Sequence, residues 1–123
     1  MNRLRVEEVI LVEGKYDAVK LADMVDGLIL TTDGFAIFRN EEKKRLILEL
    51  GRKRGIIVLT DSDAAGFRIR AHINQFAQGI AVKNAYVPAI AGKEGRKASP
   101  SKEGLLGVEG VPAEMILQAL RTA

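Results

Sequence analysis

The sequence predicts an α/β fold with a four-stranded, mostly parallel sheet and helices on both faces. This prediction comes from the way that two kinds of segment alternate along the chain. Short runs of aliphatic and β-branched residues alternate with stretches whose apolar residues recur at helical spacing. Strands that alternate with helices form parallel sheets, because each helix carries the chain back to where the next strand starts. The 123 residues contain no internal repeat and no domain linker, so we expect one domain over 1–123.

The first half of the chain supplies two strands and two helices in this interpretation. Four apolar residues in a row predict a strand over 9–12, and helical spacing predicts a helix over about 15–24. A second short strand is expected at 28–31. Asn40 is a residue type that caps helices, so it should precede a helix over 41–50.

The second half repeats the alternation. Gly51 should end the preceding helix, because glycine is common just past a helix end. The central strand is predicted at 56–59, followed by a helix over 66–78 and a strand over 80–87. Pro112 suits the first turn of a helix and should open the last one.

The composition excludes several kinds of site and favours a nucleic-acid partner. The absence of cysteine excludes disulfides and thiolate metal sites, and a single histidine argues against zinc. The apolar runs are too short to span a bilayer and the first residues lack the apolar core of a signal peptide, so we expect a cytoplasmic protein without a membrane partner. The net charge of +3 mildly favours a polyanion. The stretch 92–104, rich in Gly, Lys and Ser, should form a mobile basic loop.

The residues that point to chemistry are acids that follow two of the predicted strands. Asp61 and Asp63 follow the central strand, and Gly66 comes three residues later. Glu13 and Asp17 follow the first strand. If these strands are neighbours, their carboxyl ends bring the four acids together, at the edge where open α/β sheets bind ligands. Grouped carboxylates raise one another's pKa values unless a cation neutralises them.

The nature of these ligands predicts the ion and the chemistry. Oxygen ligands without histidine or cysteine select a hard cation, so Mg²⁺ or Mn²⁺ is expected. Such ions also bind substrate phosphates, which favours phosphoryl or phosphodiester chemistry with one carboxylate as general acid or base. The alternative is that the acids are solvated and cap helices; for Asp17, a role in complementing the helix dipole is equally expected.

These motifs resemble those of the Toprim domain, which topoisomerases, bacterial primases, some nucleases and recombination proteins share. The resemblance covers nearly the whole chain and implies the Toprim, Rossmann-like fold. Each piece that carries it stands at the end of a predicted strand: Glu13-Gly14-x-x-Asp17, Gly34, and Asp61-x-Asp63-x-x-Gly66.

Within that family, the chain is most similar to the ribonuclease that matures 5S ribosomal RNA (ribonuclease M-five type). That similarity implies an Mg²⁺- or Mn²⁺-dependent hydrolase of RNA phosphodiester bonds that acts in rRNA processing. The subfamily has a further C-terminal region, which this chain is expected to lack. Two segments carry the similarity: Thr60-Asp61-x-Asp63-x-x-Gly66-x-Arg68-Ile69-Arg70, and Gly107-Val108-Glu109 before the last helix.

The resemblance also implies roles for individual residues. The catalytic residues would be Glu13, Asp61 and Asp63. The same three, with Asp17, would hold the metal ion. Three glycines would shape the site: Gly14, Gly34 and Gly66. Basic side chains would contact the nucleic-acid backbone, which positions a substrate without reading its sequence. They are Lys15, Arg68, Arg70, Lys93, Arg96 and Lys97.

Other functions compete with this interpretation. The chain has Ala65 where topoisomerases carry a third acid, which argues against that class. A non-catalytic nucleic-acid-binding Toprim module, or a primase- or topoisomerase-related Toprim protein, is the main alternative, and a ribosomal or other protein partner would suit a binding module. A haloacid-dehalogenase-type phosphatase places its nucleophilic aspartate after the first strand, where this chain has Glu13, so we rank it low.

Overall fold

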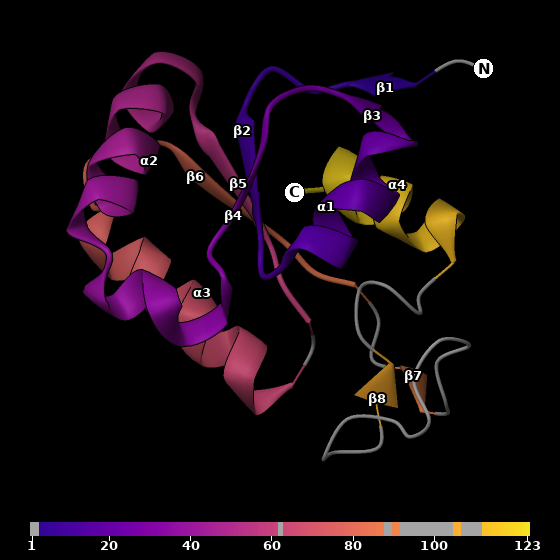
Figure 1. Ribbon diagram of the computed structural model, residues 1–123. Coiled ribbons are helices and arrows are strands. Elements are labelled where there is room, and N and C mark those ends of the chain that lie inside the picture. The colour runs from indigo at the N-terminus through magenta and orange to yellow at the C-terminus, as the bar shows by residue number, and fades with distance from the viewer. Residues whose placement is uncertain (1–2, 62, 88–89, 92–104, 107–111) are drawn as a thin grey trace.

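The computed structural model in Figure 1 describes residues 3–61, 63–87, 90–91, 105–106 and 112–123. Its centre is a four-stranded sheet in the order β4-β2-β5-β6, and every neighbouring pair in it is parallel. This confirms the predicted fold class. The strands of this sheet are β2 (Val9–Val12), β4 (Ile29–Thr31), β5 (Ile56–Leu59) and β6 (Val82–Ala85).

The two central strands are β2 and β5, and both are buried along their whole length. Leu11 pairs with Leu30 on one side and with Val58 on the other. Continuous apolar runs are what a parallel sheet covered on both faces requires, because every side chain on such a strand faces a helix layer. The expected adjacency of the first and third predicted strands is therefore observed, and it sets their carboxyl ends side by side.

Helices cover both faces of the sheet (Figure 1). On one face, α1 (Lys15–Ala22) and α4 (Ala113–Arg121) contribute Leu21 and Ile116 to the core. On the other, α2 (Glu41–Arg54) and α3 (Ala64–Phe76) contribute Ile47 and Ile73. Successive strand residues point to opposite faces, so the sheet divides its apolar residues between the two core layers. One layer contains Ile10, Val12, Ile57 and Leu59, and the other contains Val9, Leu11, Ile56 and Val58.

Several small elements lie outside the predicted pattern. A parallel pair joins β1 (Leu4–Arg5) to β3 (Val25–Asp26), and an antiparallel pair joins β7 (Ile90–Ala91) to β8 (Leu105–Leu106). A 3₁₀ helix, η1 (Gly34–Arg39), connects β4 to α2. Each is too short to leave a periodic signal in the sequence.

The structure corrects the predicted end of α2. The helix continues through Gly51 to Arg54, and it is Gly55, with φ +81°, that follows its last residue. Gly51 is instead a packing residue, because a Cβ atom there would lie 2.7 Å from Cδ1 of Ile56. The helix predicted over 66–78 also starts earlier, at Ala64. The predicted basic loop 92–104 and the segment 107–109 lie outside the described residues.

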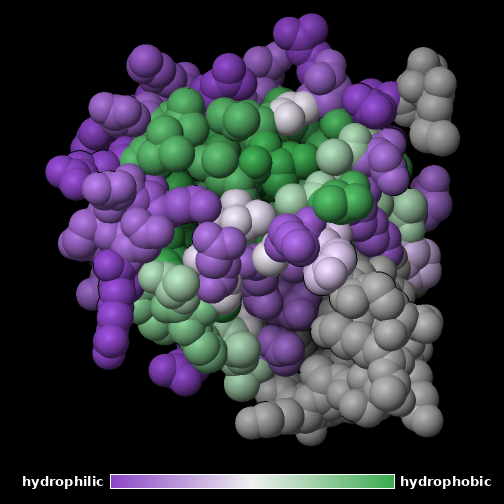
Figure 2. Space-filling model, in the orientation of Figure 1, coloured by the Kyte–Doolittle hydropathy of each residue, from purple (hydrophilic) through white to green (hydrophobic). Residues whose placement is uncertain are grey.

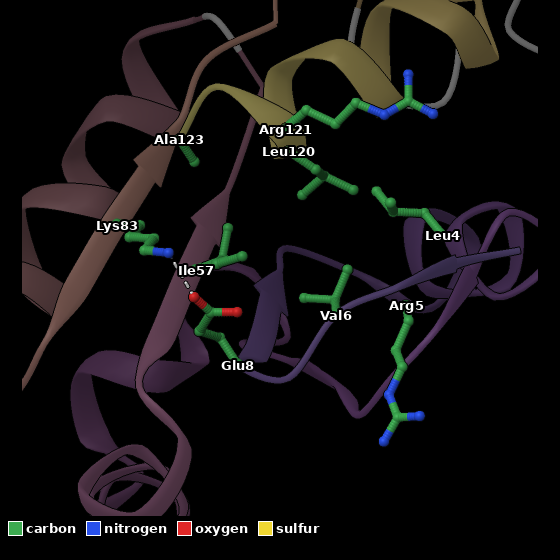
Figure 3. Close-up of a pocket in the computed structure, with 9 residues that line it drawn as sticks. All are labelled: Leu4, Arg5, Val6, Glu8, Ile57, Lys83, Leu120, Arg121 and Ala123. Carbon is green, nitrogen blue, oxygen red and sulfur yellow. Dashed lines mark ion pairs between the residues drawn. The ribbon is translucent and has the colours of Figure 1, made fainter.

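A pocket of about 150 Å³ lies at the amino ends of the strands (Figure 3). An ion pair of 2.7 Å between Glu8 and Lys83 lies within it. Glu8 precedes β2, so this pocket is at the opposite edge of the sheet from Glu13 and is a separate feature. Its lining residues are Leu4, Arg5, Val6, Glu8, Ile57, Lys83, Leu120, Arg121 and Ala123. In the described parts of the chain, no helix has the length and apolar character needed to cross a membrane.

Candidate active site

Glu13 lies immediately after β2, at the centre of the side of the sheet where the carboxyl ends of the strands meet, which we call the carboxyl edge. Its backbone carbonyl accepts hydrogen bonds from the N–H of Gly34 at 3.0 Å and the hydroxyl of Thr32 at 3.3 Å, both beyond β4. Its carboxyl Oε1 accepts a hydrogen bond from the N–H of Asp61 at 3.3 Å, beyond β5. One residue thus joins the ends of three adjacent strands.

The turn after β4 brings the Gly34 N–H to this position. Asp33 and Gly34 both have left-handed backbone conformations, with φ values of +58° and +62°. A left-handed conformation is costly for a residue with a Cβ, so Asp33 carries the strain of the turn while Gly34 adopts it freely. The hydroxyl of Thr31 donates to Oδ1 of Asp33 at 2.9 Å and steadies the turn.

Two of the predicted site acids also cap helices. Oδ1 of Asp63 accepts a hydrogen bond from the N–H of Gly66 at 2.8 Å and so caps α3. Oδ2 of Asp17 accepts one from the N–H of Gly14 at 3.2 Å, in the first turn of α1. Capping satisfies backbone N–H groups that have no partner within the helix. Because a carboxylate has two oxygens, this role is compatible with metal binding.

The close approach of α3 to Glu13 requires a glycine at position 66. A Cβ atom on Gly66 would overlap the carbonyl oxygen of Asp61 and would lie 2.9 Å from Oε1 of Glu13. Gly14 differs, because its backbone is extended and a Cβ there would have an ordinary contact with Asp17 at 4.0 Å. The geometry therefore gives a reason for glycine at positions 66 and 34, and none at 14.

Electrostatics couples the four acids. The pKa of Glu13 is raised from 4.5 to about 8, first because the carboxyl group is buried and then because Asp61 and Asp63 repel its charge. Asp17 adds a smaller repulsion, and the hydrogen bond from the Asp61 N–H acts in the opposite direction. The structure therefore brings Glu13 into one electrostatic cluster with the three aspartates, and Glu13 holds a proton at neutral pH in the absence of a cation.

The donor set suits a hard divalent cation. Within the described residues, no three acidic or histidine side chains converge into an arrangement that could hold a metal ion. The cluster nevertheless consists of carboxylate oxygens, the ligands that Mg²⁺ and Mn²⁺ prefer. A cation would also relieve the repulsion that raises the pKa of Glu13. The residues thus fit such an ion chemically, and coordination requires the carboxylates to turn towards a common point.

Two of the predicted basic residues lie at this edge. Lys15, on the first turn of α1, is exposed, with its Nζ 5.5 Å from the ring centre of Tyr16. Arg68, on α3, is exposed, with its guanidinium 5.1 Å from the ring centre of Phe35. The three basic residues predicted in the loop 92–104 lie outside the described part of the chain. They are Lys93, Arg96 and Lys97.

The prediction that Arg70 contacts the nucleic-acid backbone is corrected by its burial. The side chain is only 6% exposed, and its guanidinium hydrogen-bonds to the ends of β5 and β6, so it does not present a free charge at the surface. It instead ties α3 to the ends of β5 and β6. Its two terminal nitrogens donate to four acceptors at 2.7 to 3.2 Å: the carbonyls of Val58 and Ala85, Oγ1 of Thr60 and Oδ1 of Asn84.

The chain is similar in sequence to known proteins. Residues 8–92 match the sequence profile of the Toprim domain. Ribonuclease M5 of Clostridium botulinum is 38% identical over 118 residues, which are 96% of this chain and 59% of that protein. Ribonuclease M5 of Lactiplantibacillus plantarum is 42% identical over 117 residues, which are 94% of this chain and 57% of that protein. The chain thus spans less than two thirds of the length of these curated relatives.

A solved structure is similar along almost the whole chain. It is that of a small TOPRIM domain protein from Bacillus stearothermophilus, with a TM-score of 0.64 and 23% sequence identity. The alignment covers 99% of this chain and 90% of that one. At this level of identity, the similarity speaks for the fold.

Proposed function

The chain belongs to the Toprim family, and on that premise we propose that it is the catalytic domain of a divalent-metal-dependent ribonuclease of the M5 kind. In this proposal it hydrolyses phosphodiester bonds of structured RNA in the cytoplasm, with the precursor of 5S ribosomal RNA as the first substrate to test. The observation that carries the proposal is the carboxyl group of Glu13, held between two strand ends with its pKa raised to about 8.

The four acids have distinct parts in the proposed reaction. Glu13, Asp61, Asp63 and Asp17 would hold Mg²⁺ or Mn²⁺, which when bound supplies a Lewis acid for the scissile phosphate. Glu13 would also be the general acid or base, since its carboxyl group lies between the ends of β2 and β5 beside the other acids. The N–H of Asp61 fixes the orientation of this carboxyl group through Oε1.

Basic residues would hold the substrate at this edge. Lys15 and Arg68 are exposed on the two helices that start beside the acids, and in this proposal they would bind phosphates of the substrate. Lys93, Arg96 and Lys97 belong to the same proposal. Such contacts position RNA without reading its sequence.

A second candidate function is RNA binding without cleavage, in concert with a ribosomal or other protein partner. One observation favours it. No three ligands converge on a metal position in the described part of the chain. In this case the acids would serve mainly as helix caps, as Asp63 and Asp17 do here.

Cleavage by the purified chain separates the two candidates. We expect end-labelled 5S precursor RNA to be cleaved in Mg²⁺ or Mn²⁺ and to stay intact in EDTA. Glu13→Gln should lower the rate by about 100-fold or more, because it removes the proton-transferring group. Glu49→Gln, an exposed glutamate on α2, is the matched control and should cleave like wild type. Unrelated structured RNA and single-stranded DNA test the choice of substrate.

Two results would overturn the nuclease proposal. One is equal cleavage by wild type and Glu13→Gln, which would point to a contaminating nuclease. The other is binding that weakens steeply with salt but is never followed by cleavage, which would support the binding module.

A further inference from the structure

The central sheet ends laterally in β4 on one side and in β6 on the other, and these two strands differ in character. β6 has the exposed Lys83 in its middle, a charge that discourages another strand from pairing there. In β4 and just before it, Leu28, Ile29 and Leu30 follow one another without a charge or a proline, and all three are partly exposed. An exposed apolar strand of this kind is a template for pairing with another chain.

The backbone of β4 has free polar groups on its outer side. The N–H of Ile10, in β2, donates to the carbonyl of Leu28 at 2.8 Å, and the ladder between the two strands continues through Leu30. Alternate residues of a strand direct their backbone groups to opposite sides, so the N–H and C=O groups of Ile29 and Thr31 point away from β2. Within the described part of the chain, no strand pairs with this outer side.

Apolar side chains of α2 extend this surface. The start of α2 lies beside the end of β4, because Nζ of Lys43 is 3.5 Å from Oδ2 of Asp33. Leu46 and Leu50 follow Lys43 on the same side of the helix, at intervals of three and four residues, and Leu46 is 42% exposed. Figure 2 shows a broad hydrophobic area over β4, between α2 and α1. We call five residues the apolar stripe: Leu28, Ile29, Leu30, Leu46 and Leu50.

Charges at the two ends of α2 indicate which partner fits this surface. Glu42, in the first turn, and Lys53, in the last turn, are exposed and lie on the helix side of Leu46. Neither forms an ion pair within the described residues. When two copies of α2 lie antiparallel, Glu42 of one copy faces Lys53 of the other. A twofold axis makes this match at both ends, so a second copy of the chain is complementary by symmetry.

We propose that the apolar stripe is a dimer interface, in which β4 of two copies pairs antiparallel across a twofold axis at Ile29. Ile29 then faces its own copy, and Leu28 faces Leu30 of the other copy, so apolar side chains meet. Stable interfaces bury about 800 Å² on each partner, more than a short strand provides, and the leucines of α2 supply additional area. Both carboxyl edges stay open, so the inference does not rest on the proposed function.

Sedimentation velocity of the whole chain over a range of concentrations tests the interface. We expect a species of twice the chain mass of 13.4 kDa. Glu42→Lys and Lys53→Glu each place like charges opposite one another, and each should weaken dimerisation about tenfold or more. The double variant places opposite charges together again and should dimerise within about threefold of wild type. Arg52→Glu, at the neighbouring exposed residue of α2, is the matched control and should dimerise like wild type.

A cysteine on the twofold axis tests the pairing of the strands. The sequence has no cysteine, so a single introduced thiol can form a disulfide only with the same residue of another copy. Opposed residues that exchange both backbone hydrogen bonds have Cα atoms about 5.5 Å apart, which suits a disulfide. We expect Ile29→Cys to give a crosslinked dimer on mild oxidation. Met115→Cys, at an exposed residue of α4, is the control and should stay largely uncrosslinked.

Three results would overturn the dimer interface. A wild-type chain that is monomeric at its highest soluble concentration would exclude the second copy and leave the stripe to an extended segment of another protein. A dimer that the two charge variants do not weaken would have to form through a different surface. Equal crosslinking of Ile29→Cys and Met115→Cys would contradict the pairing of β4 with its copy.

Discussion

Glu13 is the residue on which the geometry and the electrostatics of the site converge. Its backbone carbonyl accepts a hydrogen bond from the turn after β4, and its carboxyl group accepts one from the backbone that follows β5. Burial beside Asp61 and Asp63 makes its ionised form costly. The fold therefore favours the protonated form of Glu13 among the other acids. The protein is less stable at alkaline pH, where Glu13 loses this proton.

The raised pKa of Glu13 predicts a pH-dependent loss of stability. Its pKa is about 8 in the folded protein and 4.5 ordinarily, so the folded state keeps a proton that the unfolded state has lost between these values. Its contribution is fully present below about pH 4.5 and is lost as pH rises through about 8. Glu13→Gln removes this dependence. The free energy of unfolding of wild type, relative to the variant, should fall by ~2 kcal/mol between about pH 5 and about pH 8, a value discounted for partial exposure.

Urea denaturation in EDTA at the two pH values measures this difference. Glu49→Gln, at an exposed position, should show a constant difference from wild type. A constant difference for Glu13→Gln as well would contradict the raised pKa.

The two glycines of the acidic motifs should respond differently to substitution. Gly66→Ala places a methyl group against the backbone of Asp61 and the carboxyl group of Glu13, and a backbone atom cannot move aside cheaply. We expect a loss of about 1–3 kcal/mol in unfolding free energy, despite the higher helix propensity of alanine. Gly14→Ala meets only an ordinary contact and should change stability by less than about 0.5 kcal/mol. Thermal or urea unfolding compares them, and equal stabilities would contradict the close approach at Gly66.

At the scale of the element, polar contacts from the middle and the last turns of α3 fix it to the sheet. Asp63 caps its first turn, and Arg70 joins its middle to the ends of β5 and β6. Near its end, the amides of Asn74 and Asn84 exchange hydrogen bonds at 3.0 and 3.3 Å. Apolar packing tolerates sliding and rotation, whereas directional bonds set the position of the helix. The loop that carries Asp61 and Asp63 is thereby held in register with Glu13.

The guanidinium of Arg70 should be difficult to replace. Arg70→Lys keeps the charge but loses the planar fork that reaches four acceptors, so most of these buried hydrogen bonds are lost. We expect a loss of about 2–4 kcal/mol in unfolding free energy. Arg68→Lys, two residues earlier on the exposed side of the same helix, is the control and should be nearly neutral. If urea denaturation gives the two variants equal stability, the anchoring role of Arg70 is wrong.

The main helices and the strands of the central sheet could be predicted from the sequence because their apolar spacing reflects two-sided burial. The spacing of residues in α3 also indicates that Arg70 is buried. The buried face of this helix is formed by residues at intervals of three and four: Gly66, Ile69, Arg70 and Ile73. The resemblance to ribonucleases of the M-five type instead implied a contact of Arg70 with the nucleic-acid backbone. The end of α2 was misplaced because Gly51 is required by packing against Ile56 rather than by a turn.

The candidate site was only partly predictable. The adjacency of β2 and β5 follows from alternation of strands and helices, and it brings the acids to one edge. The bond from Asp61 to Glu13 and the left-handed turn at Asp33 depend on strand register and on contacts between distant segments, which leave no local pattern.

At the scale of the whole molecule, the acids lie at the centre of the carboxyl edge of the sheet, and exposed cations lie beside them. Lys15 and Arg68 lie at that edge, whereas Lys53 is in the last turn of α2, near the amino end of β5. A net charge of +3 is modest, so its distribution should decide how the protein meets a polyanion. Under the proposed function, the acids alone would repel RNA, and the cations beside them would attract its phosphate backbone.

Salt dependence of RNA binding measures this distribution. Lys15→Gln and Arg68→Gln should each lower the slope of log K against log salt by about 1, because each removes one phosphate contact. Lys53→Gln removes the same charge from the opposite edge and should leave the slope unchanged. Fluorescence anisotropy at several salt concentrations gives the slopes. Equal effects of all three variants would mean that net charge alone governs binding.

The position of Glu13 also decides when the site comes into existence. Its partners Thr32 and Asp61 lie 19 and 48 residues further along the chain. Contacts of such sequence separation form only after the intervening loops have closed, which is the slow part of folding for a parallel sheet. A chain emerging from the ribosome therefore has no assembled acid cluster until the central strands have met. Competence of the site is a property of the completed fold, so a chain in which β2 and β5 have not paired has no assembled site.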